Sequence, residues 1–292
     1  MSVTTGRPGG RPPTLLAGAV GPGSVAATAR VCWRLLVAGV RESSTYRMAL
    51  LGGLVANLTF GFLKVGILGA TVAASGGRVA GYTTATMYSY VWLSQGLLGS
   101  VNLFGRSDLA DRIKSGDIAV DFVRPLSVQL AACMREIGRG LFALLPRGLP
   151  SVLLGSLAVG ITLPGDPQGY LLGALSVLLA IGVSATTVYL VAVTGFWLVE
   201  TRGVQVLYMI LSGFLAGLFV PISLLPEWLR VVAASTPFPS MMQYPVDVLS
   251  GRVDGLAAVI LVAAQVAWLA LTTVVGQLAT AAGRRRLEVQ GG

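Results

Sequence analysis

Long apolar segments separated by short polar ones set the pattern of the sequence from Met48 onward. An α-helix of about 20 apolar residues is long enough to cross the hydrocarbon core of a bilayer. The third such segment contains Pro146 and Pro150, which predict a bend in its helix. The pattern predicts an all-α membrane protein with six transmembrane helices, over residues 48–74, 79–104, 140–163, 169–199, 204–225 and 255–282.

The segment before the first of these helices, Ser24–Arg47, has a helical period with two different faces. Apolar residues that include Trp33 and Leu36 fall on one face, and three arginines fall on the other: Arg30, Arg34 and Arg41. Such a pattern is typical of a helix that lies in the membrane interface. We therefore expect an N-terminal amphipathic elbow helix over residues 24–47, with a short solvent-exposed helix packed on its own domain as the alternative.

Between the fifth and sixth predicted helices, residues 226–254 are rich in proline and carry scattered charges. Because proline interrupts helices, no continuous transmembrane helix fits there. We expect two short helices that dip into the interface as an outer re-entrant hairpin. Residues 1–23, rich in Gly and Pro, and residues 284–292 are expected to be tails flanking a six-span domain over 48–283.

Composition supports a membrane protein, because 54% of the residues are hydrophobic and only 11% are charged. A soluble domain usually carries about 25% charged residues. The net charge of +9 does not indicate nucleic-acid binding, since the basic residues lie at the ends of the apolar segments rather than in one patch. Sixteen Arg and Lys residues fall on the side of the termini and three on the other. Basic loops stay in the cytoplasm, so both termini are predicted to be cytoplasmic.

The interval Ser107–Gln129 is the longest charge-dense part of the chain and falls on the same cytoplasmic side. Charges are costly in lipid, so this interval must lie in water or against a wet partner. Ser107 and Asp117 are suited to cap two short helices, and Gly116 to end the first. Four apolar residues are expected to form a ridge that seats in a partner's groove: Leu109, Ile113, Ile118 and Phe122. A loop kept soluble by its charges is the alternative.

Catalytic and metal-binding patterns are absent from the sequence. It contains no histidine, its two cysteines (Cys32 and Cys133) are isolated, and no GxxxxGK[ST], HExxH or GxSxG motif occurs. No catalytic residue, metal site or cofactor is therefore predicted within this chain.

The sequence GDIAVDFVRPL at residues 116–126 resembles the signature of permease subunits of type II ATP-binding-cassette (ABC) exporters, the ABC-2 family transporter proteins. GFWLVE at 195–200 is similar to the end of that family's fourth span, and the proline-spaced segment 212–245 is similar to its fifth span and outer hairpin. The resemblance covers roughly residues 24–286.

The resemblance implies a half-transporter in a bacterial inner (plasma) membrane that works as a dimer with an identical or paralogous permease. Two separate ABC ATPase subunits would hold ATP and Mg and drive export of an amphiphilic or hydrophobic compound such as a drug, antibiotic or lipid-like molecule. The segment between the second and third spans would be the coupling helix. Its implied coupling residues are Asp108, Arg112, Asp117, Asp121, Phe122, Arg124 and Pro125.

Polar and aromatic residues within the predicted spans are candidates to line a translocation pathway: Lys64, Tyr88, Trp92, Asn102, Met209, Phe214 and Phe219. Packing or anchoring at the interface is the alternative for the aromatic residues. Lys64 lies about 25 Å along the helix from Arg47, so it can snorkel to the outer interface or make a polar contact inside the dimer or the pathway.

Two other functional classes remain open from the sequence. An ion-driven secondary transporter would carry carboxylates near the bilayer midplane, and no Asp or Glu lies in the middle of a predicted span. A non-transporting membrane scaffold is the other alternative.

Overall fold

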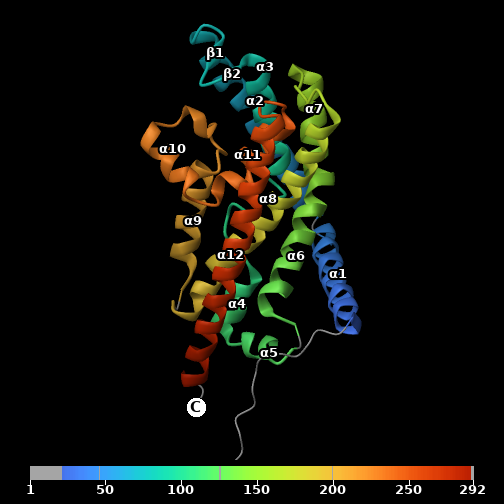
Figure 1. Ribbon diagram of the computed structural model, residues 1–292, viewed down its shortest axis with the longest axis vertical. Helices are drawn as coiled ribbons and strands as arrows, with labels where there is room; N and C mark the ends of the chain where they lie inside the picture. The colour runs from blue at the N-terminus through green and yellow to red at the C-terminus, as the bar shows by residue number, and fades with distance from the viewer. Residues whose placement is uncertain (1–21, 46, 125, 199, 291–292) are drawn as a thin grey trace, which may run out of the picture.

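The computed structural model describes residues 22–45, 47–124, 126–198 and 200–290. The chain folds into an elongated bundle of helices (Figure 1). In the described part of the chain, four helical segments are long and apolar enough to cross a membrane: Met48–Ala74, Val128–Val159, Pro167–Phe196 and Gly255–Arg286. The predicted class, an all-α membrane protein, agrees with this architecture.

Helix α8 (Pro167–Val193) is the centre of the bundle, with α12 (Gly255–Gln290) packed along it (Figure 1). Its apolar stretch is mostly buried inside the protein, whereas those of α2 (Arg47–Ala74) and α12 are mostly exposed. A helix that is apolar on all sides belongs in the core or in lipid. The outward apolar surface of α2 and α12 is therefore suited to lipid or to another membrane chain.

The second predicted span has a different form from the single helix expected over 79–104. Its first residues make a hairpin of β1 (Arg78–Val79) and β2 (Tyr82–Thr83), and helix α3 covers only Thr84–Leu97. Thr83 and Thr86 cap the start of α3 reciprocally. The chain then turns without helix, because the Asn102 side chain accepts hydrogen bonds from the amides of Phe104 and Gly105.

The third helical segment begins earlier than predicted. It runs through α6 (Val128–Ala143), a π-helical turn (Leu144–Gly148) and α7 (Leu149–Val159). The prolines therefore widen the helix locally rather than break it. The earlier start places Arg135, Glu136 and Arg139 within α6.

The fifth predicted span also contains less helix than expected. Helix α9 covers Arg202–Leu215, and a turn at Gly217, with a φ of 84°, redirects the chain toward a 3₁₀ turn at Ile222–Leu224. The following segment forms the two short helices predicted, α10 (Glu227–Ala234) and α11 (Gln243–Leu249), with a 3₁₀ turn at Phe238–Met241 between them. Helix α11 packs against α8 and α3, whereas much of α10 is exposed.

The N-terminal helix α1 (Pro22–Thr45) packs closely along α6 (Figure 1). A Cβ atom at Gly39 would overlap the main-chain oxygen of Arg135, and one at Gly138 would overlap that of Leu36. Two glycines therefore allow the two backbones to touch. Trp33 points away from this contact, with 65% of its surface exposed.

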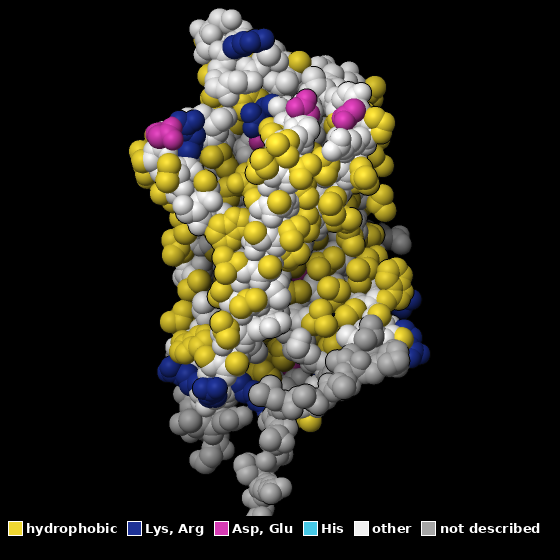
Figure 2. Space-filling model, in the orientation of Figure 1, with side chains coloured by type: hydrophobic (Ala, Val, Ile, Leu, Met, Phe, Trp, Pro, Cys, Tyr) yellow, Lys and Arg dark blue, Asp and Glu magenta, His cyan; other side chains and the backbone are white. Residues whose placement is uncertain are grey.

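The two ends of the bundle differ in charge. Helices α4 (Asp108–Ser115) and α5 (Ile118–Phe122) lie at the end where α12 finishes, and the β1–β2 hairpin lies at the other (Figure 1). On the face shown in Figure 2, Lys and Arg gather at the α12 terminus, and a broad apolar zone covers the middle of the molecule.

Candidate functional site

The segment with the highest charge density folds into the helix pair α4 and α5. The Ser107 hydroxyl accepts a hydrogen bond from the Leu109 amide and so caps α4, and Gly116 ends α4 with a φ of 82°, as predicted. Asp117 does not cap α5; its carboxylate accepts a hydrogen bond from the Ser115 hydroxyl at 2.8 Å instead. Pro125 lies outside the described residues.

The predicted apolar ridge faces inward. Leu109, Ile113 and Ile118 are buried in a cluster with α8 residues and Phe196. Phe122 stacks on Phe196 with ring centroids 6.3 Å apart, and the guanidinium of Arg284 lies 5.5 Å from the centroid of the Phe122 ring. These residues attach α4 and α5 to the bundle, so they are not free to seat in a partner's groove.

The outward side of α5 and the residue directly after it instead expose two valines that were not predicted as interface residues. Val120 is 59% exposed and Val123 is 86% exposed. Asp117 and Arg124, both exposed, flank them in sequence. The alternation of Ile118 and Phe122 with Val120 and Val123 at helical spacing was the signal, because the two pairs fall on opposite sides of a short helix.

Ion pairs hold the two short helices together. Asp121 accepts from Arg112 at 2.7 Å and from Arg124 at 3.1 Å, so three predicted coupling residues lie in one cluster. Lys114 donates to Glu200 at 2.7 Å, which joins α4 to the turn before α9. This hydrogen bond raises the pKa of Lys114 and lowers the pKa of Glu200.

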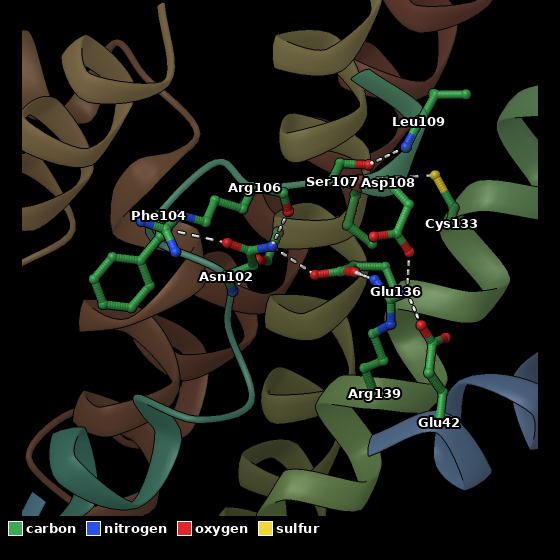
Figure 3. A network of polar contacts seen from close by, with 12 residues as sticks. Glu42, Asn102, Phe104, Arg106, Ser107, Asp108, Leu109, Cys133, Glu136 and Arg139 are labelled. Carbon is green, nitrogen blue, oxygen red and sulfur yellow. Dashed lines mark hydrogen bonds and ion pairs between the residues drawn. The ribbon is translucent and has the colours of Figure 1, made fainter. Parts of the chain in front are cut away.

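Arg139 of α6 lies at the centre of a second ionic cluster (Figure 3). Its guanidinium pairs with Asp108 at the start of α4, with Glu42 of α1 at 2.8 Å and with Glu136 of α6 at 3.2 Å. One side chain therefore connects α1, α4 and α6. We call Glu42, Asp108, Glu136 and Arg139 the Arg139 cluster.

Asn102 extends this cluster into the turn after α3. Its side-chain amide donates to Glu136 at 2.7 Å and to the Arg106 carbonyl at 2.9 Å (Figure 3). The Tyr208 hydroxyl of α9 donates to the Asn102 carbonyl at 3.0 Å. The structure thus places Asn102 in a polar junction between the turn after α3, α6 and α9, and its role in a pathway stays a prediction.

The other pathway candidates divide into packed and outward-facing residues. Trp92 is fully buried, with its ring against Gly61 and Gly155 and edge-on to Phe62 at 5.0 Å. Tyr88 lies against Gly69 of α2. These positions match the packing alternative for the two aromatic side chains.

The remaining candidates lie on or next to α9. Met209, Phe214 and Phe219 are each at least 40% exposed, and the rings of Phe214 and Phe219 are 5.0 Å apart. Lys64 of α2 donates to the Leu218 carbonyl in the turn after α9. This hydrogen bond lies within one chain, so snorkelling and a contact inside the dimer or pathway both stay predictions.

A buried polar cluster near the β1–β2 hairpin was not foreseen. The side chain of Asp247, 4% exposed, accepts hydrogen bonds from Arg252, Gln243 and Tyr82. Tyr90 donates to Gln243 and to the Gly217 carbonyl. This cluster joins α3, α11 and the turn after α9, which are too distant in sequence for a local pattern to reveal.

Metal chemistry finds no support in the described residues, which contain no group of three or more His, Cys, Asp or Glu side chains placed to hold an ion. The two cysteines are not joined to each other, and Cys133 is buried.

Comparison with known proteins identifies the family. No individual curated protein matches the sequence significantly. The family model described as ABC-2 family transporter protein matches residues 62–291, which include the α4–α5 segment and leave α1 outside. This match spans most of the chain and agrees with the family indicated by GDIAVDFVRPL. The chain belongs to the ABC-2 transporter family of membrane proteins.

Proposed function

We propose that this chain is the permease subunit of an ABC exporter in a bacterial inner membrane. Two separate ATPase subunits hydrolyse ATP with Mg, and the chain pairs with a second permease, identical or paralogous. The complex moves an amphiphilic or hydrophobic compound out of the cell. Membership of the ABC-2 family supports the association with an ATPase.

The observation that carries this proposal is the form of α4 and α5. They lie at the end of the bundle where the last turns of α12 carry Arg284, Arg285 and Arg286, and they expose Val120 and Val123. Two exposed valines beside charges of both signs give an apolar centre with a polar rim, the usual composition of a protein interface. Ile118 and Phe122 pack α5 against α8 and Phe196. Because these apolar contacts are dense, a displacement of α5 by a bound partner also displaces the helices beneath it.

The Arg139 cluster connects the α4–α5 surface to the helices α1 and α6, so movement of that surface can reach them. A displacement of α4 must carry Asp108 with it, or break its pairing with Arg139. Glu42 and Glu136 connect the same guanidinium to α1 and α6. Movement of the docking surface is therefore passed to an amphipathic elbow helix and to a membrane-spanning helix together.

The transmembrane arrangement in this proposal has six passes with both termini cytoplasmic. Helices α3 and α9, each of 14 residues, span only about 21 Å. Non-helical backbone completes these two passes, which is tolerated where protein surrounds it. Helices α10 and α11 form the outer re-entrant hairpin.

The test is ATPase association in mild detergent. The chain is co-expressed with each candidate ABC ATPase from the same genome, purified by a tag on the permease, and assayed for bound ATPase and ATP hydrolysis. Val123→Asp is expected to reduce the bound ATPase by about tenfold or more, because it places a charge in an apolar interface core. Val231→Asp, the same substitution at an exposed valine of α10, is the control and is expected to retain the ATPase.

The outcome separates the three functional classes. No co-purifying ATPase under any mild detergent condition contradicts the proposal. Transport that continues without ATPase and follows an ion gradient would support a secondary transporter. Binding without any effect on ATP hydrolysis would support a scaffold.

A further inference from the structure

A pocket of about 610 Å³ opens at the α4–α5 end of the bundle, between α1, α4, α6 and α8. Volumes of about 300–1,000 Å³ are typical of sites for small molecules. Its apolar part includes Val31 and Leu35 of α1, Val128 of α6 and Val188 of α8. The pocket is large enough for one acyl chain or a ligand of similar size.

The rim of the pocket carries charges of both signs that are unevenly distributed. Four arginines and three carboxylates contribute to the lining: Arg112, Arg124, Arg135, Arg139, Asp108, Asp121 and Glu136. Arg139 is saturated by the three carboxylates of its cluster, and Arg112 shares Asp121 with Arg124. Arg135 makes no ion pair with any residue that the structure describes. Arg112, Arg124 and Arg135 are therefore left with one carboxylate, Asp121, whereas the Arg139 cluster carries more negative than positive charge.

An apolar pocket in which three lining arginines, Arg112, Arg124 and Arg135, are left with one carboxylate selects an amphiphile whose anionic head lies beside them. Basic pockets on the cytoplasmic side of membrane helices bind anionic head groups in this way. We infer that this pocket binds a single-chain amphiphile with a carboxylate or phosphate head, the chain lying on Val31, Leu35 and Val188 and the head between Arg124 and Arg135.

The site has a consequence for the elements around it. Its walls come from α1 on one side and from α4 and the segment after α5 on the other. A bound amphiphile adds apolar contacts between α1 and the ATPase-docking segment, in parallel with the Arg139 cluster. A bound amphiphile therefore makes the contact between α1 and the α4–α5 segment more rigid.

Binding is tested with the full-length chain alone, purified in phosphatidylcholine nanodiscs, with dansyl-undecanoic acid as the fluorescent probe. The acid is expected to bind saturably, at one per chain, and more tightly than its neutral methyl ester. Arg124→Ala with Arg135→Ala is expected to weaken binding by at least about tenfold, the scale set by two basic residues at an anionic head. Arg78→Ala, at the opposite end of the molecule, is the control for loss of an arginine away from the pocket and is expected to bind as the unmodified chain.

Leu35→Trp and Val188→Trp each fill the apolar part and are expected to abolish binding while thermal unfolding shows that the protein remains folded. Competition by lauric acid or by lysophosphatidylglycerol decides between carboxylate and phosphate heads, and either result supports the site. Equal binding of the methyl ester, equal competition by dodecylamine, or unchanged binding in both folded Trp variants overturns it. No ATPase is present, so failure of the proposed coupling function leaves this test unaffected.

Discussion

At the scale of single residues, the clearest buried ion pair is that of Asp247. Asp247 lies in the protein interior, yet its carboxylate has three donors, Arg252, Gln243 and Tyr82. Arg252 also lies over the Tyr82 ring, with its guanidinium carbon 4.7 Å from the ring centroid. Buried charges are tolerated when they are paired and fully hydrogen-bonded. Loss of one of the partners of Asp247 is therefore expected to lower the free energy of unfolding by a large amount.

Arg252→Met is expected to destabilise the fold by about 3–5 kcal/mol, because it leaves the buried Asp247 carboxylate without its counter-ion. The measurement is unfolding of the purified chain in mixed micelles. Arg230→Met provides the matched control, since Arg230 pairs with Glu227 on the surface of α10 and such pairs contribute at most about 1 kcal/mol. Equal stability losses in the two variants would show that the Asp247 cluster is not a buried ion pair.

At the scale of elements, the contact between α1 and α6 depends on two glycines. Gly39 and Gly138 lie where the main chain of the other helix leaves no space for a Cβ atom. Such close approach brings Glu42 within reach of Arg139 at 2.8 Å. The position of the N-terminal helix and the Arg139 cluster are therefore linked.

Gly39→Leu is expected to separate α1 from α6, destabilise the protein by about 2 kcal/mol or more, and weaken ATPase stimulation by breaking the Glu42 pair. Gly52→Leu in α2 serves as control, because nothing lies within 4 Å of a Cβ atom there. Thermal unfolding and ATP hydrolysis of the complex are measured together. Wild-type values for Gly39→Leu would contradict the close contact.

The ends of helices could be predicted from neighbouring residues in the sequence, whereas contacts between residues far apart in the sequence could not. Ser107 and Gly116 bound α4 as predicted, because capping and positive φ are properties of neighbouring residues. The direction of Leu109 and Ile118 was predicted wrongly, because rotation of a short helix depends on which surface it packs against. The helix over 79–104 was overextended because the Asn102 turn interrupts an apolar run without a proline. Asp247 and Tyr82, 165 positions apart, gave no pattern at all.

At the scale of the whole molecule, three regions of the bundle differ in their surface and burial. A broad apolar zone faces outward in the middle, α8 supplies the buried centre, and the charged α4–α5 end carries the surface proposed for the ATPase (Figure 2). The predicted membrane class and family are confirmed by the four long apolar helical segments and by the family match over residues 62–291. The segment predicted as one coupling region has two sides. Its buried side packs α4 and α5 against the bundle, and its exposed side is available to a partner.

The central claim is that the exposed side of α5 contacts an ABC ATPase. A photo-crosslinking amino acid placed at Val123 in cells that express the complete transporter tests it directly. We predict an adduct of the permease with the ATPase, absent when the same group replaces Val231 on α10. Adducts of position 123 with lipid or with the permease alone, in cells where ATPase and permease co-purify, would contradict the account.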